Sequence, residues 1–217
     1  MLEANNPFTI LLAGDITPSP RLSGQVQGTR IIACDGGIRH AKTLGLQPEV
    51  WVGDFDSALE SDKADFANLP TQAHPQKKNA TDGQIAMEEA LVRGADGLIL
   101  VGAFGGRTDH SFAIMTQACA LAETGTPVLL TDGREEAVVL SPSPRTFDYS
   151  GGTQFSVLAF TDLTGLTLTG AVWPLEERDM PFGDTLTISN EVAGTMSAKL
   201  RGGRALLIAQ IGEQKEV

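Results

Sequence analysis

The chain has 217 residues, 41% of them hydrophobic, which is enough for one large core or two modest ones. Its formal net charge of -11, from 27 acidic and 16 basic residues, argues against broad binding to nucleic acids or anionic membranes. No apolar run approaches the roughly 20 residues of a bilayer span, and the first residues lack the order of a secretory signal, so we expect a cytoplasmic protein.

Short apolar runs alternate with helix-like segments from residue 8 to about residue 140. Several runs are continuously hydrophobic, which is typical of strands buried on both faces. The alternation predicts βαβ units, a mainly parallel sheet with flanking helices, and ligands bound beyond the carboxyl ends of the strands. The predicted strands lie within residues 8–13, 29–34, 49–52, 97–103 and 126–131, and helical patterns cover 36–45, 81–94 and 108–125.

The pattern changes at residues 141–152, where two prolines and two glycines interrupt it. We expect an α/β nucleotide- and metal-binding catalytic domain over residues 1–142, followed by a smaller all-β domain over residues 150–217. Short β-rich runs separated by glycine, proline and aspartate indicate a sandwich or roll. These runs lie within residues 153–160, 166–175, 183–192, 194–200 and 204–211.

Asp54 and Asp56 follow the strand-like run VWVG. In an extended backbone both would point to one side and Phe55 to the other. Two carboxylates about 4 Å apart repel by roughly 4 kcal/mol at an effective dielectric near 20, which favours a bound divalent cation such as Mg²⁺. A solvated turn is the alternative, because Asp and Ser form turns after strands.

A second acidic element begins the predicted helix over residues 81–94. Thr81 and Gln84 match a capping box, and Asp82 falls in the first turn, where the helix dipole favours a carboxylate. Capping alone could explain both residues. Alternatively, Lys77 and Lys78 supply local positive charge, so that this helix start meets a phosphate and its metal.

A glycine-rich stretch leads into the next predicted helix. Gly105 and Gly106 would let backbone N–H groups approach an anion, Arg107 offers planar donors, and Thr108 could cap a helix begun by Asp109. The stretch predicts a phosphate site, with a tight turn before a capped helix as the alternative. Its spacing matches neither a P-loop nor the dinucleotide-binding glycine pattern.

A fourth candidate is the motif ACDGG, in which Asp35 ends a strand and Gly36 and Gly37 open a helix. Asp35 could hold a ribose hydroxyl or a nucleotide-bound metal, or it could simply cap the helix. The two cysteines, Cys34 and Cys119, have apolar neighbours and are expected to be reduced core thiols.

Taken in order, the motifs ACDGG, GDFDS, TD at a helix start, GGRTDH and a late SNE resemble those of the thiamine pyrophosphokinase family. The resemblance extends from about residue 9 to residue 210. It implies an α/β domain followed by a smaller β domain, in a homodimer with active sites at the subunit boundary. It also implies Mg²⁺-dependent transfer of a diphosphoryl group from ATP to the hydroxyl of thiamine, which gives thiamine diphosphate and AMP.

The resemblance implies roles for the candidate residues. Asp54, Asp56 and Asp82 would engage Mg²⁺ and the ATP phosphates, which Arg107 and Asp109 would order. The residues expected at the nucleotide are Asp35, Gly36, Gly37, Lys78, Thr81, Gly105 and Gly106.

The β domain would supply the thiamine contacts. Trp173 would stack on thiamine, and Ser189 and Asn190 would contact its pyrimidine. Many relatives carry an acid two residues before the Thr of the TD motif, where this chain has Asn79. An amide at this position can still hydrogen-bond a water ligand of the metal.

Three other functions fit the same residues. A phosphatase could use Asp54 as a nucleophile and Asp56 as an acid, through a phosphoaspartate intermediate. A pyrophosphokinase could act on another alcohol, such as a hydroxymethylpterin. A non-catalytic nucleotide or thiamine sensor could use the same pocket without turnover.

Overall fold

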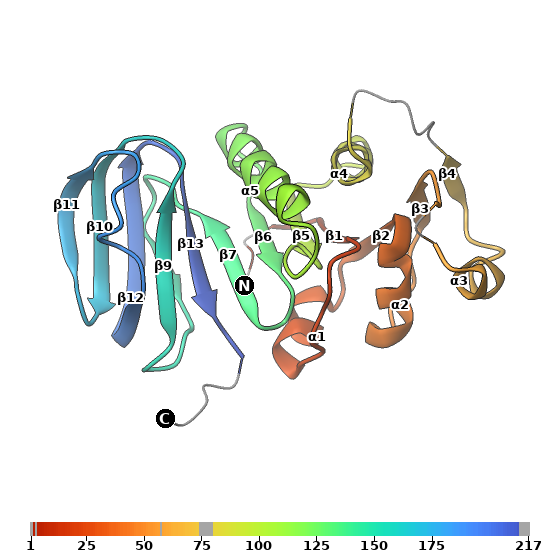
Figure 1. Ribbon diagram of the computed structural model, residues 1–217, viewed down its shortest axis with the longest axis horizontal. Coiled ribbons are helices and arrows are strands. Elements are labelled where there is room, and N and C mark those ends of the chain that lie inside the picture. The colour runs from red at the N-terminus through yellow and green to blue at the C-terminus, as the bar shows by residue number, and fades with distance from the viewer. Residues whose placement is uncertain (1, 3, 57, 74–79, 213–217) are drawn as a thin grey trace. The chain divides into compact units, whose positions relative to one another are not determined.

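The computed structural model describes residues 2, 4–56, 58–73 and 80–212 (Figure 1). Their contacts divide the chain into two compact units, Met1–Gly133 and Arg134–Val217. Within the described residues, no helix combines the length and the apolar character needed to cross a bilayer.

The N-terminal unit contains a parallel sheet in the order β6-β5-β1-β2-β3-β4. Ile10 of β1 pairs with Ile32 of β2 on one side and Leu100 of β5 on the other. All three side chains are completely buried, as expected for continuous apolar strands. The strands are β1 (Pro7–Leu11), β2 (Arg30–Cys34), β3 (Val50–Gly53), β4 (Thr71–Ala73), β5 (Gly97–Val101) and β6 (Val128–Thr131).

The helices of this unit begin with the expected local signals. Ser19 caps α1 by accepting a hydrogen bond from the Leu22 N–H, with Pro20 in the first turn. Thr81 caps α4 by accepting from the Gln84 N–H at 3.2 Å, which confirms the predicted cap. The helices are α1 (Pro20–Val26), α2 (Arg39–Leu44), α3 (Glu60–Asp65), α4 (Asp82–Val92) and α5 (Thr108–Glu123), and a 3₁₀ turn, η1 (Asp35–Ile38), precedes α2.

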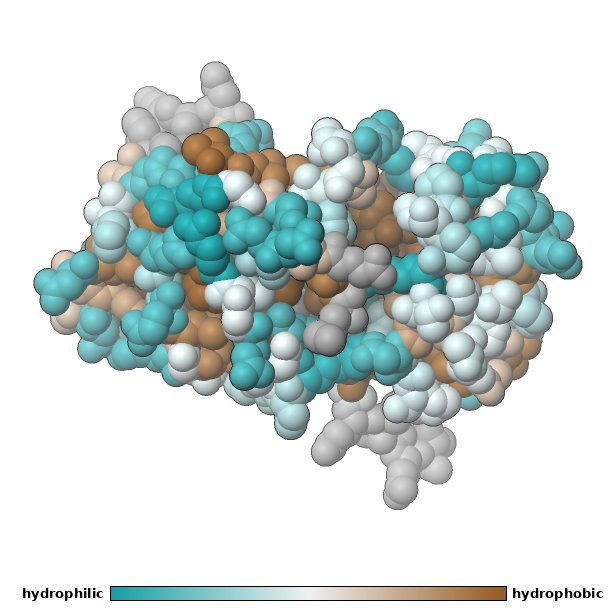
Figure 2. All heavy atoms as spheres, turned by 180° about the vertical axis from the view of Figure 1, so that it is seen from behind, coloured by the Kyte–Doolittle hydropathy of each residue, from teal (hydrophilic) through white to brown (hydrophobic). Residues whose placement is uncertain are grey.

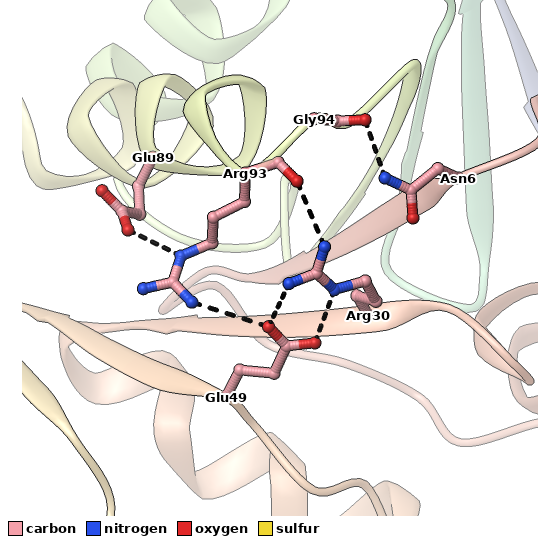
Figure 3. Close-up of polar contacts among 6 residues, drawn as sticks. All are labelled: Asn6, Arg30, Glu49, Glu89, Arg93 and Gly94. Atoms are coloured by element: carbon pink, nitrogen blue, oxygen red, sulfur yellow. Dashed lines mark hydrogen bonds and ion pairs between the residues drawn. The ribbon is translucent and has the colours of Figure 1, made fainter.

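A network of ion pairs ties the C-terminal end of α4 to the start of β2 (Figure 3). The Arg30 guanidinium forms two 2.7 Å bonds to the Glu49 carboxylate and donates to the Arg93 carbonyl at 3.1 Å. Arg93 in turn pairs with Glu89 at 2.6 Å. Because α4 begins with Asp82 and ends beside Arg93, this network fixes the far end of the helix that carries a predicted site residue.

The C-terminal unit consists of antiparallel strands in the order β7-β13-β9-β12-β10-β11, with β8 also paired to β12. The start of β12 pairs with β9, whereas its later residues pair with β10 and β8. Phe155, Leu166 and Met196 contribute buried side chains to its core. The strands are β7 (Glu135–Val139), β8 (Arg145–Phe147), β9 (Gln154–Ala159), β10 (Leu163–Ala171), β11 (Leu175–Met180), β12 (Asn190–Gly202) and β13 (Ala205–Gln210).

The predicted fold class is confirmed, since a parallel α/β part precedes a β-rich part. The compact units divide after Gly133 because β7 pairs with β13 of the second unit. The functional division predicted around residues 141–152 stays a prediction. Cys34 and Cys119 are buried and are not joined in a disulfide, as expected.

Two strand assignments in the second unit differ from the sequence analysis. The run 183–192 was expected to be a strand, but turns and irregular backbone occupy residues 183–189 and β12 begins at Asn190. Thr187 is still buried, where its hydroxyl donates to the Val157 carbonyl at 2.7 Å. The charged segment Leu175–Met180 forms the unexpected strand β11, whose middle residues are exposed.

Candidate functional site

A cavity of about 600 Å³ lies at the carboxyl ends of β1, β2, β3 and β5 in the N-terminal unit. Ligands bind at this edge in parallel α/β sheets, and the volume suits a small molecule. Most of the lining residues are small or acidic. They are Leu12, Ala13, Gly14, Cys34, Asp35, Asp54, Asp56, Ala80, Thr81, Asp82, Gly83, Gly102, Ala103, Gly106, Arg107, His110, Ser111, Ala113 and Ile114.

Four of the predicted acids meet in this cavity: Asp35, Asp54, Asp56 and Asp82. Burial is the largest cause that raises the pKa of Asp35 to about 6; the negative charges of Asp82 and Asp54 contribute, and the hydrogen bond from the Phe55 N–H opposes them. The cavity therefore concentrates negative charge.

The chemistry of these donors fits a hard divalent cation, because carboxylate oxygens are the ligands that Mg²⁺ prefers. Among the described residues, however, no group of three or more His, Cys, Asp or Glu side chains could hold a metal by itself. Asp54, Asp56 and Asp82 therefore share a cavity without forming a closed protein site. A cation here would need oxygen ligands from substrate and water, as is usual for Mg²⁺.

The backbone around Asp54 and Asp56 is not extended, so that geometric expectation was wrong. β3 ends at Gly53, and Phe55 has a left-handed φ of 61°. The Asp56 N–H donates to Asp54 Oδ1 at 3.1 Å, a turn contact that the alternative interpretation anticipated. Both aspartates nevertheless line the cavity, while the Phe55 ring packs edge-on against Trp51 with ring centroids 5.0 Å apart.

Asp35 follows β2 and also has a left-handed backbone, with φ 45°. Its carboxylate accepts a 3.2 Å hydrogen bond from the Phe55 N–H, and its backbone carbonyl accepts a 2.9 Å bond from the Trp51 indole N–H. Gly36 and Gly37, which were expected at the nucleotide, are buried in η1 and do not line the cavity. A Cβ on Gly37 would lie 2.1 Å from the Leu11 carbonyl oxygen, so this glycine permits close packing on β1.

The start of α4 and the loop before α5 supply the opposite wall. Thr81 and Asp82 line the cavity, and so do Gly106 and Arg107, whereas Gly105 does not. Gly105 has φ 73°, which explains the need for glycine in this loop.

Arg107 lies at the cavity beside Asp109. Its guanidinium makes a bidentate pair with the Asp109 carboxylate, at 2.7 and 3.2 Å, and this pair lowers the pKa of Asp109. Both side chains are largely exposed. The helix starts at Thr108 with Arg107 in the cap position, so the prediction that Thr108 caps it was wrong.

The sequence analysis missed the part of the cavity lining that follows β1. Gly14 approaches the β5 loop so closely that a Cβ would lie 2.3 Å from the carbonyl oxygens of Gly102 and Phe104. Two residues of the α2 region hold this wall: Arg39 donates to the Ala13 carbonyl at 2.6 Å, and His40 Nε2 lies 2.8 Å from the Gly14 carbonyl oxygen. Burial lowers the pKa of His40, which keeps the ring neutral.

The position of Gly14, soon after a predicted strand, was the one sequence signal for this wall. His110, which the sequence analysis did not assign to the site, also lines the cavity. Lys77, Lys78 and Asn79 lie outside the described residues, so the expected role of Lys78 and the effect of Asn79 stay predictions.

The candidate thiamine residues belong to the C-terminal unit. The Trp173 side chain is exposed, at 61%. Asn190 is buried, and its side chain accepts from the Trp173 N–H at 3.2 Å and donates to the Trp173 carbonyl at 2.8 Å. Ser189 has φ 61° and is exposed beside it. Asn190 therefore fixes the backbone of Trp173.

Exposure alone does not make Trp173 part of a binding surface. On the face drawn in Figure 2, hydrophobic and hydrophilic residues are intermixed. Scattered exposed apolar residues are common on folded proteins. The two hydrogen bonds between the Asn190 side chain and the Trp173 backbone are more specific, because they fix the main chain that carries this exposed aromatic residue.

Comparison with known proteins gives a consistent result for both units. Residues 26–130 match the sequence model of "Thiamin pyrophosphokinase, catalytic domain", and residues 145–201 match "Thiamin pyrophosphokinase, vitamin B1 binding domain". A thiamine pyrophosphokinase of Bacillus subtilis is 28% identical over 190 residues, which cover 85% of this chain and 89% of the relative.

Solved structures agree. The thiamine pyrophosphokinase from Bacillus subtilis superposes with a TM-score of 0.83 at 25% identity, covering 95% of this chain and all of the other. The enzyme from Geobacillus thermodenitrificans gives 0.80 at 25% identity, covering 96% and 99%. Because both domains match in order and over most of their length, the chain belongs to the thiamine pyrophosphokinase family and is an enzyme of that family, forming thiamine diphosphate.

Proposed function

We propose that the enzyme transfers a diphosphoryl group from ATP to the hydroxyl of thiamine in a Mg²⁺-dependent reaction that releases AMP. The observation that carries this proposal is the single cavity in which Asp35, Asp54, Asp56, Asp82 and Arg107 meet. Four acids and one guanidinium suit a polyphosphate bound together with a divalent cation.

Phosphoryl transfer depends mainly on positioning and charge stabilisation, and it requires no nucleophilic side chain. Asp54, Asp56 and Asp82 would hold Mg²⁺, which when bound neutralises phosphate charge and lowers the repulsion to attack. The Arg107 guanidinium, oriented by Asp109, would donate to phosphate oxygens at the mouth of the cavity. Thr81 and Gly106 would bring backbone N–H groups close to the same phosphates.

Asp35 would contact the nucleotide, whereas the other cavity acids would hold Mg²⁺. It lies at the end of β2, where we assign it to the nucleotide, and burial is the largest cause of its raised pKa. Its raised pKa means that burial and the neighbouring carboxylates oppose ionisation at this position. A bound cation, or a ribose hydroxyl that donates to the carboxylate, would relieve this opposition.

The C-terminal unit would bind thiamine. Trp173 offers an exposed aromatic face to a cationic ring, an interaction worth about 0.5 to 2 kcal/mol. Asn190 would contribute by holding the Trp173 backbone, with Ser189 adjacent. We further propose a homodimer with a cytoplasmic location, which would place these residues at a site shared between subunits.

The test is incubation of the purified protein with ATP, Mg²⁺ and thiamine, with separate quantification of AMP, inorganic phosphate and thiamine diphosphate. The proposal predicts AMP and thiamine diphosphate in equal amounts, and neither product when thiamine or Mg²⁺ is omitted. Phosphate release without thiamine would favour the phosphatase alternative. Transfer only to a hydroxymethylpterin, or saturable binding without turnover, would favour the other two alternatives.

A further inference from the structure

We propose that Trp51 is a positioning residue, whose indole holds Asp35 and Phe55 in strained backbone conformations that direct the Asp35 carboxylate at the cavity. The inference rests on the proposed function, because Trp51 acts through an acid that we assign to the substrate site. It concerns a buried side chain that neither lines the cavity nor belongs to the motifs that identified the family.

The first observation is strain at two neighbouring loops. Asp35, after β2, has φ 45°, and Phe55, after β3, has φ 61°. Left-handed backbone in residues other than glycine costs on the order of 1 kcal/mol or more, and a bulky aromatic residue rarely adopts it. Such conformations persist where surrounding contacts over-determine them.

Three contacts form a closed circuit around these loops. The Trp51 indole N–H donates to the Asp35 carbonyl at 2.9 Å. The Phe55 N–H donates to Asp35 Oδ1 at 3.2 Å. The Phe55 ring meets the Trp51 ring edge-on, with centroids 5.0 Å apart and planes at 74°. Each of the two strained residues therefore contacts both the other one and Trp51.

Gly53 completes the arrangement. It has φ 146°, and a Cβ built there would lie 1.8 Å from Asp35 Oδ1. The Asp35 carboxylate thus occupies the space where any other residue at position 53 would place its side chain. Its orientation is fixed by Gly53 on one side and by the Phe55 N–H on the other.

The indole N–H acts on Asp35 alone. Phe55 contacts Trp51 through its ring, and a phenylalanine at position 51 would keep a ring there. A buried aromatic residue that served only for packing would need no indole N–H. Trp51 instead uses that donor on the carbonyl of a strained cavity acid. The N–H is therefore the feature to remove.

A double-mutant cycle between Trp51→Phe and Asp35→Asn tests this role. Phenylalanine keeps a buried ring but lacks the donor. We expect Trp51→Phe to lower kcat/KM for ATP at least about tenfold in the native background, and by less than about twofold when Asp35→Asn is already present. Phe8→Leu is the control, since Phe8 is a buried aromatic at the amino end of β1, far along the strand from the cavity. Phe8→Leu should change kcat/KM by the same factor in both backgrounds.

Equal effects of Trp51→Phe in the two backgrounds would show a purely structural role and overturn the inference. Full activity in Asp35→Asn would overturn it as well, because Trp51 would have nothing to act through. Failure of the proposed function is distinguishable: the unmodified enzyme would then form no AMP from ATP and thiamine.

A measurement on the unmodified protein covers the case in which Trp51→Phe does not fold. The chain has two tryptophans, Trp51 buried and Trp173 exposed, so a Trp173→Phe variant leaves one indole N–H resonance and assigns Trp51. The Trp51 signal should exchange slowly and shift when Mg²⁺ and a non-hydrolysable ATP analogue are added. A fast-exchanging Trp51 signal, or one that does not move at saturation, would contradict the proposal.

Discussion

Asp35→Asn should stabilise the ligand-free protein at neutral pH while it lowers activity. Burial is the largest of the effects that raise the pKa of Asp35 from 3.8 to about 6. A difference of about 2 units corresponds to at most about 3 kcal/mol of unfolding free energy, and to less here because solvent screens this partly exposed carboxyl. Asparagine is neutral, can accept the same Phe55 N–H, and tolerates a left-handed φ.

The stability gained by Asp35→Asn should depend on pH. The folded protein binds the Asp35 proton more tightly than the unfolded chain does, so this contribution to stability is fully present below about pH 4. It is lost as the pH rises through about 6. At pH 7.5 the unfolding free energy of the variant should therefore exceed that of the native protein by about 1 to 3 kcal/mol, and roughly two thirds of this advantage should be lost at pH 4.5.

Urea unfolding at both pH values, with a chelator present, measures the effect. Asp96→Asn is a control of opposite sign, because Asp96 accepts N–H groups of Asn5 and Asn6, which lower its pKa. Its stabilising contribution is present at pH 7.5 and is lost in acid, so Asp96→Asn should be less stable than the native protein at pH 7.5. An Asp35→Asn protein that is no more stable than the native one at pH 7.5 would refute the reasoning.

Three further predictions concern the cavity and the C-terminal unit. Asp54→Asn and Asp56→Asn should each lower kcat at least about 100-fold, or about 2.7 kcal/mol of barrier, with unchanged circular dichroism; near-normal turnover in both would remove the metal assignment. Gly14→Ala should lower the unfolding free energy by about 1 to 3 kcal/mol, because its Cβ would overlap two carbonyl oxygens. In the same urea titration Gly24→Ala, with no atom within 4 Å, should raise it by about 0.5 to 1 kcal/mol. Trp173→Ala should raise KM for thiamine roughly tenfold and leave KM for ATP unchanged, and steady-state kinetics with each substrate varied would expose equal effects on both.

Much of the first unit could be predicted because its strands are buried on both faces. Runs such as GLILV have no polar residue, and β5 is completely enclosed. Short elements with mixed composition escaped notice, among them α3 and β4. The charged strand β11 was missed for a related reason, since it lies at the end of the strand order and needs few apolar residues.

The membership of the cavity was more predictable than its geometry. Asp35, Asp54 and Asp82 follow strands or begin a helix, so chain order alone places them at one edge of the sheet. The backbone conformations of Asp35 and Phe55 could not be foreseen, because left-handed φ in such residues depends on tertiary contacts. The role of Trp51 depends on the same contacts, so it was invisible in sequence.

Glycine and alanine form much of the cavity lining, including Ala13, Gly14, Gly102 and Ala103. An inhibitor seated against these positions would touch mainly main-chain atoms, which no point substitution can delete. Resistance would then have to come from enlarging a wall residue. Such a change would also narrow the space left for the phosphate-bearing substrate, so escape from the drug and loss of catalysis would tend to arise together.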